Sequence, residues 1–161
     1  MFKKILIANR GEIACRIIST AKKMGIKTVA ICSDPDENSP HVNYADEYIN
    51  IGGQTSADSY LVINKIISAL KASKADAVHP GYGFLSENVQ FRDEIQKAGK
   101  IFIGPPSQAI SLMGDKIESK KIAKKAGVSV VPGGLNIIKN IDKAIIEAKK
   151  IGYPLMVKAS A

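Results

Sequence analysis

Short apolar runs alternate with longer segments of helical period up to Pro106, and this alternation constrains the fold more than any other feature. The runs that fit β-strands are Ile5–Ala8, Thr28–Cys32, Tyr48–Ile51, Ala75–His79 and Ile101–Ile103. The segments that fit α-helices are Ile13–Met24, Tyr60–Ala72 and Glu87–Ala98. Because strand–helix–strand units with short connections keep successive strands parallel, the pattern predicts an α/β fold with helices on both faces of a parallel sheet.

The pattern changes after Pro106, where we expect a domain boundary near residues 106–114. We place it so that the domains are residues 1–112 and 113–161. In the second domain, Asp115 and Glu118 have the spacing of a capping box, which predicts a helix from Asp115 to Ala126. The further elements predicted are strands at Val128–Val131 and Leu155–Lys158 and a helix at Asp142–Lys150. This stretch ends in mid-pattern, so we expect it to be the start of a truncated domain.

The composition is that of a globular protein, with 45% apolar and 24% charged residues. No run reaches the roughly 18 apolar residues of a membrane span, and Ile5–Ala8 is too short for a signal-peptide core. Cys15 and Cys32 have no metal-ligand spacing, which favours core packing in a reducing compartment. We therefore expect a cytoplasmic protein without a membrane partner.

The net charge of +8 raises the question of nucleic-acid binding. Of the 23 basic residues, 20 are lysine and 3 are arginine, whereas bidentate recognition of bases and phosphates favours arginine. Most lysines between Lys116 and Lys125 fit the solvated face of a helix. We expect no nucleic-acid partner.

Ligands of parallel sheets approach the carboxyl ends of the strands, where three loops are expected: Asn9–Glu12, Ser33–Pro40 and His79–Asn88. Asn9–Glu12 contains one glycine and lacks a dinucleotide fingerprint, although Asp34 lies near the distance at which such sites place an acid. We therefore interpret Arg10 and Glu12 as residues that hold the start of a helix against a neighbouring loop.

The segment His79–Asn88, called the glycine loop below, has two glycines among aromatic residues. Gly81 and Gly83 would let the backbone approach a ligand, and Tyr82 would lay its ring against a flat substrate. Glu87 is expected in the first turn of the following helix, where its charge is favourable. The alternative is an ordinary glycine turn with an aromatic plug.

Two lysines occupy positions that favour an anion. Lys158 ends an apolar run, where burial of an ammonium group is costly unless an anion meets it. Lys116 falls in the first turn of a predicted helix, whose end is already positive. Both positions suit a polyphosphate, but a solvated strand end and an exposed surface lysine remain the alternatives.

Together these segments resemble the biotin carboxylase family over essentially the whole chain. The segments that carry the resemblance are Ile7–Ala14, His79–Asn88, Met113–Lys116 and Tyr153–Ser160. Within that family, Met113–Lys120 looks most like the α chain of propionyl-CoA or acyl-CoA carboxylases.

The resemblance implies a Rossmann-like pre-ATP-grasp domain followed by the start of an ATP-grasp domain. It implies an enzyme in which ATP with magnesium or manganese activates bicarbonate as carboxyphosphate, and biotin on a carrier domain is carboxylated. Lys116 and Lys158 match the two lysines that contact the phosphates or base of ATP. Tyr82 and Gly83 match the loop beside the biotin pocket, and Glu87 lies nearby as an organising residue.

The resemblance also implies partners and missing parts. The partners are a biotin carboxyl carrier domain, a carboxyltransferase subunit or domain and possibly a second copy, although Ser19 and Lys23 leave the usual dimer open. The phosphate lid, the metal-binding carboxylates and the catalytic base of the family belong after Ala161. We therefore expect no catalytic or metal-binding residue in this chain and no bicarbonate-dependent ATP hydrolysis by it alone.

Two alternatives remain open. One is the front part of another ATP-grasp ligase, of the carbamoyl-phosphate synthetase or urea carboxylase type. The other is a non-catalytic module that binds a partner chain, which would bind a biotinyl carrier without binding ATP.

Overall fold

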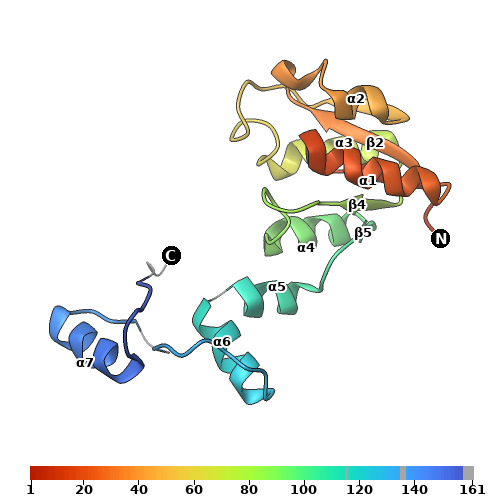
Figure 1. Cartoon of the computed structure of the whole chain (residues 1–161). Coiled ribbons are helices and arrows are strands. Elements are labelled where there is room, and N and C mark those ends of the chain that lie inside the picture. Colours follow the sequence, from red (N-terminus) through yellow and green to blue (C-terminus); the bar gives the residue numbers. More distant parts are fainter. Residues whose placement is uncertain (115, 135–136, 158–161) are drawn as a thin grey trace. The chain divides into compact units, whose positions relative to one another are not determined.

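The computed structural model describes residues 1–114, 116–134 and 137–157, and of Lys116 the backbone alone. Contacts between Cα atoms divide the chain into two compact units, Met1–Ile110 and Ser111–Ala161 (Figure 1). The first unit contains the sheet.

All five strands of the first unit are parallel and lie in the order β3-β2-β1-β4-β5. The strands are β1 (Lys4–Ile7), β2 (Lys27–Cys32), β3 (Glu47–Asn50), β4 (Ala77–His79) and β5 (Ile101–Phe102). The helices and the one 3-10 turn of this unit are α1 (Gly11–Lys23), η1 (Asp34–Asp36), α2 (Pro40–Tyr44), α3 (Ile63–Ser73) and α4 (Val89–Lys97). This Rossmann-like order confirms the predicted parallel sheet. The strand order reverses between β1 and β4, because the chain adds β2 and β3 on one side of β1 and then β4 and β5 on the other. This is the switch point of the sheet.

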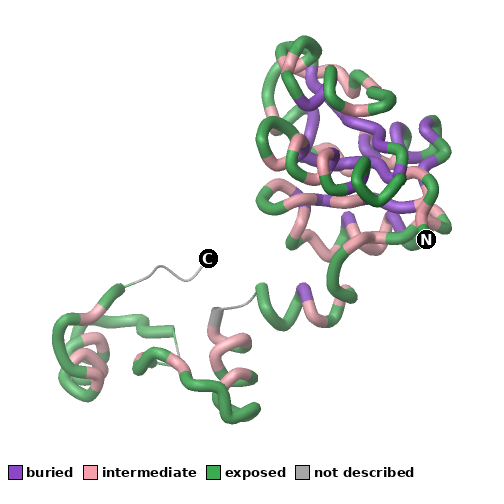
Figure 2. Tube along the Cα trace, turned by 45° about the vertical axis from the view of Figure 1, so that its right-hand side comes forward, coloured by how far each residue is buried: buried purple, intermediate pink, exposed green. Residues whose placement is uncertain are grey.

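Alternate residues of the strands face opposite layers of helices. Leu6, Val29 and Val78 belong to a core that also contains the buried residues of α3 and α4. Ile5 and Ile7 on the other face pack with buried residues of α1. Since successive strand side chains point to opposite faces, the sheet is covered on both sides, and its buried residues run through the centre of the unit (Figure 2).

The start of α4 differs from the prediction. The helix begins at Val89, and the Asn88 side chain accepts a hydrogen bond of 2.8 Å from the backbone N–H of Phe91. Asparagine is among the preferred N-caps because its short side chain satisfies an otherwise unpaired N–H at the helix start. Glu87 therefore lies outside the helix, and its predicted place in the first turn was wrong.

Other elements were missed or misplaced. Neither α2 nor α5 (Ser107–Gly114) was predicted, and Tyr60 lies before α3, not within it. In α2 the proline stands at the first helical position, where a missing N–H costs nothing, so a residue that suggested a loop in fact begins a helix.

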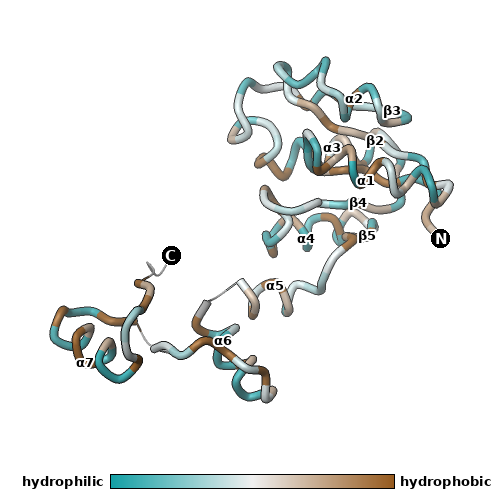
Figure 3. Tube along the Cα trace, in the orientation of Figure 1, coloured by the Kyte–Doolittle hydropathy of each residue, from teal (hydrophilic) through white to brown (hydrophobic). Residues whose placement is uncertain are grey.

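The second unit contains α6 (Lys116–Lys125) and α7 (Ile141–Ile151). The predicted strand at Val128–Val131 does not form, and the described part of Leu155–Lys158 is irregular. A strand needs a partner to satisfy its backbone, and no β-strand occurs among the described residues of this unit. The α7 helix carries isoleucines that are exposed, and Figure 3 shows their apolar colour on it. Asp115 and Lys158 lie outside the described residues.

Two sequence expectations concern the environment of the chain. Cys15 is half-buried and Cys32 is fully buried, and both are free thiols. Burial, with smaller contributions from nearby acidic residues, raises the pKa of Cys32 to about 11, so this thiol stays protonated. None of the helices in the described part of the chain is long and apolar enough to cross a membrane.

Replacement of Phe91 by alanine is expected to destabilise the first unit by about 3–5 kcal/mol, because it leaves a cavity beneath α4. Phe91 is fully buried and meets Phe102 edge to face, with ring centroids 6.1 Å apart. Urea unfolding followed by circular dichroism measures the change. The control is Gln90→Ala on the exposed side of α4, expected within about 0.5 kcal/mol of the parent. Equal midpoints for the two variants would contradict this packing.

Candidate functional site

The three predicted loops meet at the carboxyl edge of the sheet. β1 is hydrogen-bonded to β2 on one side and to β4 on the other, so the segments that follow these strands emerge together. A fourth segment, between β3 and α3, also reaches this edge and contributes Tyr60, which sequence reasoning had placed in a helix. The sequence signal that could have indicated this position is that Tyr60 is an aromatic residue directly after the turn-rich stretch 52–59.

Arg10 connects the loops after β1 and β2. Its Nη1 donates to Oδ2 of Asp36 at 3.1 Å, and its guanidinium carbon lies 5.5 Å from the Tyr60 ring centroid and 5.8 Å from that of Phe84. A planar cation is suited to bind a carboxylate at its edge and aromatic faces on its sides. We call Arg10, Asp36, Tyr60 and Phe84 the Arg10 cluster. Its geometry confirms that Arg10 holds the helix start against a neighbouring loop.

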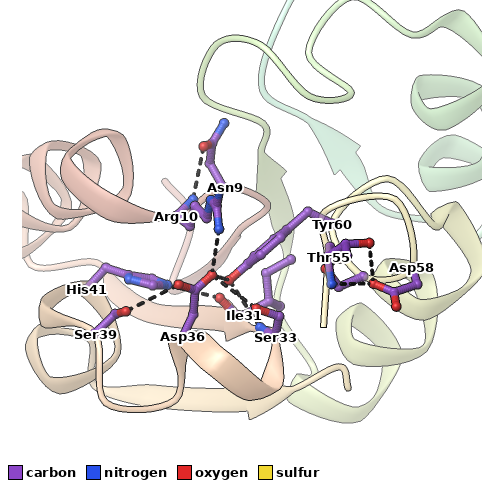
Figure 4. Close-up of polar contacts among 11 residues, drawn as sticks. Asn9, Arg10, Ile31, Ser33, Asp36, Ser39, His41, Thr55, Asp58 and Tyr60 are labelled. Carbon is purple, nitrogen blue, oxygen red and sulfur yellow. Dashed lines mark hydrogen bonds and ion pairs between the residues drawn. The ribbon is translucent and has the colours of Figure 1, made fainter. Parts of the chain in front are cut away.

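Asp36 is the acceptor at the centre of this cluster, and Figure 4 shows Arg10, Ser33 and Tyr60 converging on it. The Tyr60 hydroxyl donates to Oδ2 of Asp36 at 2.7 Å, and the Ser33 hydroxyl donates to the same oxygen at 3.1 Å. Although burial opposes ionisation, these hydrogen bonds and that from Arg10 hold the pKa of Asp36 below its ordinary value. Burial, followed by the bond to Asp36, raises the pKa of Tyr60. Both groups therefore keep one protonation state near neutral pH and serve structure.

Asn9 connects the loop after β1 to the glycine loop after β4. It is 1% exposed, and its Nδ2 donates to the carbonyl oxygens of Pro80 at 2.8 Å and of Tyr82 at 2.9 Å. Because Asn9 follows β1 and is bonded to the loop that follows β4, it lies at the switch point of the sheet, where open sheets of this kind bind dinucleotides. The Asp34 carboxylate is also engaged, since it accepts from the N–H of Gly53 at 3.1 Å. Asn9 and Asp34 thus both have partners within the protein at this edge.

The two glycines of the glycine loop have different surroundings. Both have a left-handed backbone, with φ of +67° at Gly81 and +68° at Gly83. A Cβ on Gly81 would lie 2.7 Å from Nδ2 of Asn9 and 2.8 Å from Cγ2 of Ile13, whereas one on Gly83 would meet nothing within 4 Å. A side chain at position 81 would therefore collide with the protein's own Asn9, whereas Gly83 is exposed and has open space beside its Cα.

Tyr82 is 59% exposed, and its hydroxyl donates to Oε1 of Glu12 at 2.6 Å. This bond raises the pKa of Tyr82 and confirms that Glu12 contacts a neighbouring loop. Glu87 is exposed, and it makes no hydrogen bond or ion pair with another residue of the described ranges. Tyr82 and Gly83 are thus exposed neighbours on the glycine loop, and Glu87 is an exposed residue further along the same loop.

The two predicted phosphate-binding lysines lie in the second unit. Lys116 is the first residue of α6, which confirms its place in the first helical turn. Its side chain and the whole of Lys158 lie outside the described residues.

The two histidines were not among the predicted site residues. His41 is fully buried with its Nε2 3.2 Å from the carbonyl oxygen of Ile31, and no described residue hydrogen-bonds its Nδ1. His79 Nδ1 accepts from the N–H of Gly81 at 3.0 Å. Burial lowers the pKa of both imidazoles, so both are neutral in the folded chain at neutral pH.

Gly81→Ala is expected to be more damaging than Gly83→Ala. Both substitutions force a side chain into a left-handed backbone, at a cost of about 1–2 kcal/mol. Gly81→Ala adds a clash with Asn9 and Ile13, worth about 1–3 kcal/mol more. Chemical denaturation of both variants measures the difference, and equal destabilisation would refute the close approach of Asn9.

The free energy of unfolding is expected to fall as the pH drops from about 7 toward 5. A histidine whose pKa is lowered by folding stabilises the protein fully above its unfolded value of about 6.5, and this contribution is lost as the pH falls below it. The slope is at most about 1.4 kcal/mol per pH unit for each histidine. Denaturation at several pH values tests this for the parent, His41→Gln and His79→Asn. The variant that carries both substitutions provides the reference slope, and a parent slope as flat as that of this double variant would contradict the prediction.

The comparisons with known proteins agree with this architecture. Residues 1–110 match the family model described as "Biotin carboxylase, N-terminal domain", and residues 115–161 match "Carbamoyl-phosphate synthase L chain, ATP binding domain". The propionyl-CoA carboxylase alpha chain of Ruegeria pomeroyi is 58% identical over 161 residues, which cover all of this chain and 24% of that relative. The chain thus spans about a quarter of that relative's length.

Two solved structures are similar in sequence and in fold. The biotin carboxylase domain of Hydrogenobacter thermophilus 2-oxoglutarate carboxylase has a TM-score of 0.86 and 47% identity, over 96% of this chain and 34% of that chain. The urea carboxylase of Kluyveromyces lactis has a TM-score of 0.79 and 50% identity, over 81% of this chain and 12% of that one. With a family model matching most of its length and an identity above half to a curated relative, the chain belongs to the biotin carboxylase family.

Proposed function

We propose that this chain is the amino-terminal portion of the biotin carboxylase component of a biotin-dependent acyl-CoA carboxylase of the propionyl-CoA or acetyl-CoA type. The observation that carries the proposal is the order of two family matches along one chain, a biotin carboxylase N-terminal domain followed by an ATP-binding domain. The 58% identity to a propionyl-CoA carboxylase alpha chain supports the finer assignment.

The proposed reaction is an ATP-dependent carboxylation. The γ-phosphoryl group of ATP passes to bicarbonate, which gives ADP and carboxyphosphate. Carboxyphosphate breaks down to phosphate and CO₂. The released phosphate takes the proton of a ureido nitrogen of biotin, and that nitrogen bonds to the CO₂ carbon. Positive groups placed where phosphoryl charge accumulates stabilise such a transfer.

We propose that Lys116 and Lys158 supply positive charge to ATP. Lys116 is suited to this task because it opens α6, whose first N–H groups are also positive. Lys158 follows an apolar run, which leaves its ammonium group in need of an anion.

We propose Tyr82 and Gly83 as the biotin side of the site, with Glu87 as a neighbouring residue. The exposed position of Gly83 and the open space beside its Cα support this, since a ligand can approach the chain closely there. The exposed Tyr82 ring, anchored by Glu12, offers an apolar surface beside it.

The remaining assignments are part of the same proposal. Bicarbonate and ATP with magnesium or manganese are supported by the Hydrogenobacter structure, which is a complex with MgADP, ADP and bicarbonate. The Hydrogenobacter structure is also a dimer of that domain, which supports a homodimer. A biotin carboxyl carrier domain and a carboxyltransferase would complete the reaction. A boundary between residues 112 and 113 and a cytoplasmic location complete the proposal, the latter supported by the two free thiols.

One alternative function has an observation in its favour. The 50% identity to a urea carboxylase allows the same amino-terminal fold to serve urea in place of an acyl-CoA. Assay of the full-length protein and its partners with propionyl-CoA, acetyl-CoA and urea as acceptors separates these functions.

In the full-length protein, Lys116→Gln and Lys158→Gln are each expected to lower kcat/KM for ATP by about 10- to 100-fold. This corresponds to the loss of a hydrogen bond to a charged group, about 1.5–3 kcal/mol. The measurement is biotin-dependent ATP hydrolysis at varied ATP. Lys124→Gln, on the exposed surface of the same α6 helix, is the matched control and is expected to stay within twofold. If all three variants behave alike, neither lysine serves ATP.

A further inference from the structure

The glycine loop is anchored at three places by residues from other segments. The ring of Phe84 stacks on Tyr60, with centroids 5.3 Å apart and planes inclined by 7°, and the hydroxyl of Tyr82 is held by Glu12. These two anchors hold side chains of the loop. Asn9 holds its main chain, because its amide binds the carbonyl oxygens on both sides of Gly81.

Only one orientation of the Asn9 side-chain amide satisfies all of its hydrogen-bond partners. Its Oδ1 accepts from the backbone N–H of Arg10 at 2.9 Å, so the amide oxygen faces β1–α1 and both N–H groups face the glycine loop. An aspartate of nearly the same shape would place a carboxylate oxygen against two carbonyl oxygens, which repels them.

The side chain of Asn9 is also held more rigidly than a side chain on the surface would be. It is 1% exposed, follows β1 at the centre of the sheet, and lies against Gly81, which has no side chain to separate them. A buried polar group whose partners are all matched is costly to disturb, so the loop carbonyls are fixed relative to the sheet.

We propose that Asn9 is a positioning residue for the carboxylation of biotin. Its amide fixes the main chain of residues 80–82, and this sets where Tyr82 and the open backbone of Gly83 meet the ureido ring. The inference rests on the proposed function. It assigns Asn9 an effect on biotin and none on ATP, which is proposed to meet Lys116 and Lys158.

The test compares Asn9→Asp with Thr28→Val in the full-length protein. Thr28 is equally buried and loses a hydrogen bond of 2.7 Å to Asp46, but it lies at the amino edge of the sheet, away from the glycine loop. Asn9→Asp is expected to raise KM for biotin at least tenfold. KM for ATP and the bicarbonate-dependent ATP hydrolysis without biotin should stay within twofold. Thr28→Val should leave KM for biotin, KM for ATP and the ATP hydrolysis without biotin unchanged.

Equal effects of both variants on KM for biotin, or an equal rise in KM for ATP, would overturn the inference. A milder variant, Asn9→Ser, keeps one donor and is expected to fall between the parent and Asn9→Asp.

A second measurement tests the positioning of the glycine loop by Asn9 independently of the proposed function. In the 161-residue chain, the Gly81 amide is protected by His79, and its hydrogen exchange is expected to accelerate at least tenfold in Asn9→Asp but not in Thr28→Val. Unchanged exchange refutes the positioning by Asn9. A parent protein that does not carboxylate biotin refutes the proposed function instead.

Discussion

The central place of β1 in the sheet is the constraint on which the candidate site depends. Parallel pairing with β2 on one side and β4 on the other brings three chain segments to one edge. Two successive residues at the end of β1 then reach in opposite directions, Arg10 to Asp36 after β2 and Asn9 to the glycine loop after β4. A single strand end thereby sets the mutual position of loops that are some 45 residues apart in sequence.

The charged and polar groups at this edge form hydrogen bonds with one another. Asp36 stays ionised because Tyr60, Arg10 and Ser33 donate hydrogen bonds to it, and Tyr60 stays protonated because it is buried and donates to Asp36. The edge is therefore a rigid support that offers an exposed ring and an accessible backbone, at Tyr82 and Gly83. The proposed role of the first unit, to position biotin, would use this support.

Periodicity in the sequence predicted the parallel sheet, its two helical layers and the three loops at its carboxyl edge, since each depends on local pattern and chain direction. The partner of Gly81 could not be predicted, because the contact with Asn9 joins residues that only the sheet brings together. The strand expected at Val128–Val131 failed for the opposite reason: its pattern suited a strand, but pairing depends on a neighbour that the pattern does not encode. Tyr60 was missed because a tertiary contact, not helical packing, buries it.

The backbone of Phe84 has a consequence for sequence variation in this family. Its φ of +42° is unfavourable for a bulky residue, and the stack on Tyr60 compensates for it. If evolution replaces the tyrosine by a small aliphatic residue, the compensation disappears while the unfavourable torsion stays. We therefore expect homologues that lack an aromatic group at the position of Tyr60 to carry glycine or asparagine at the position of Phe84.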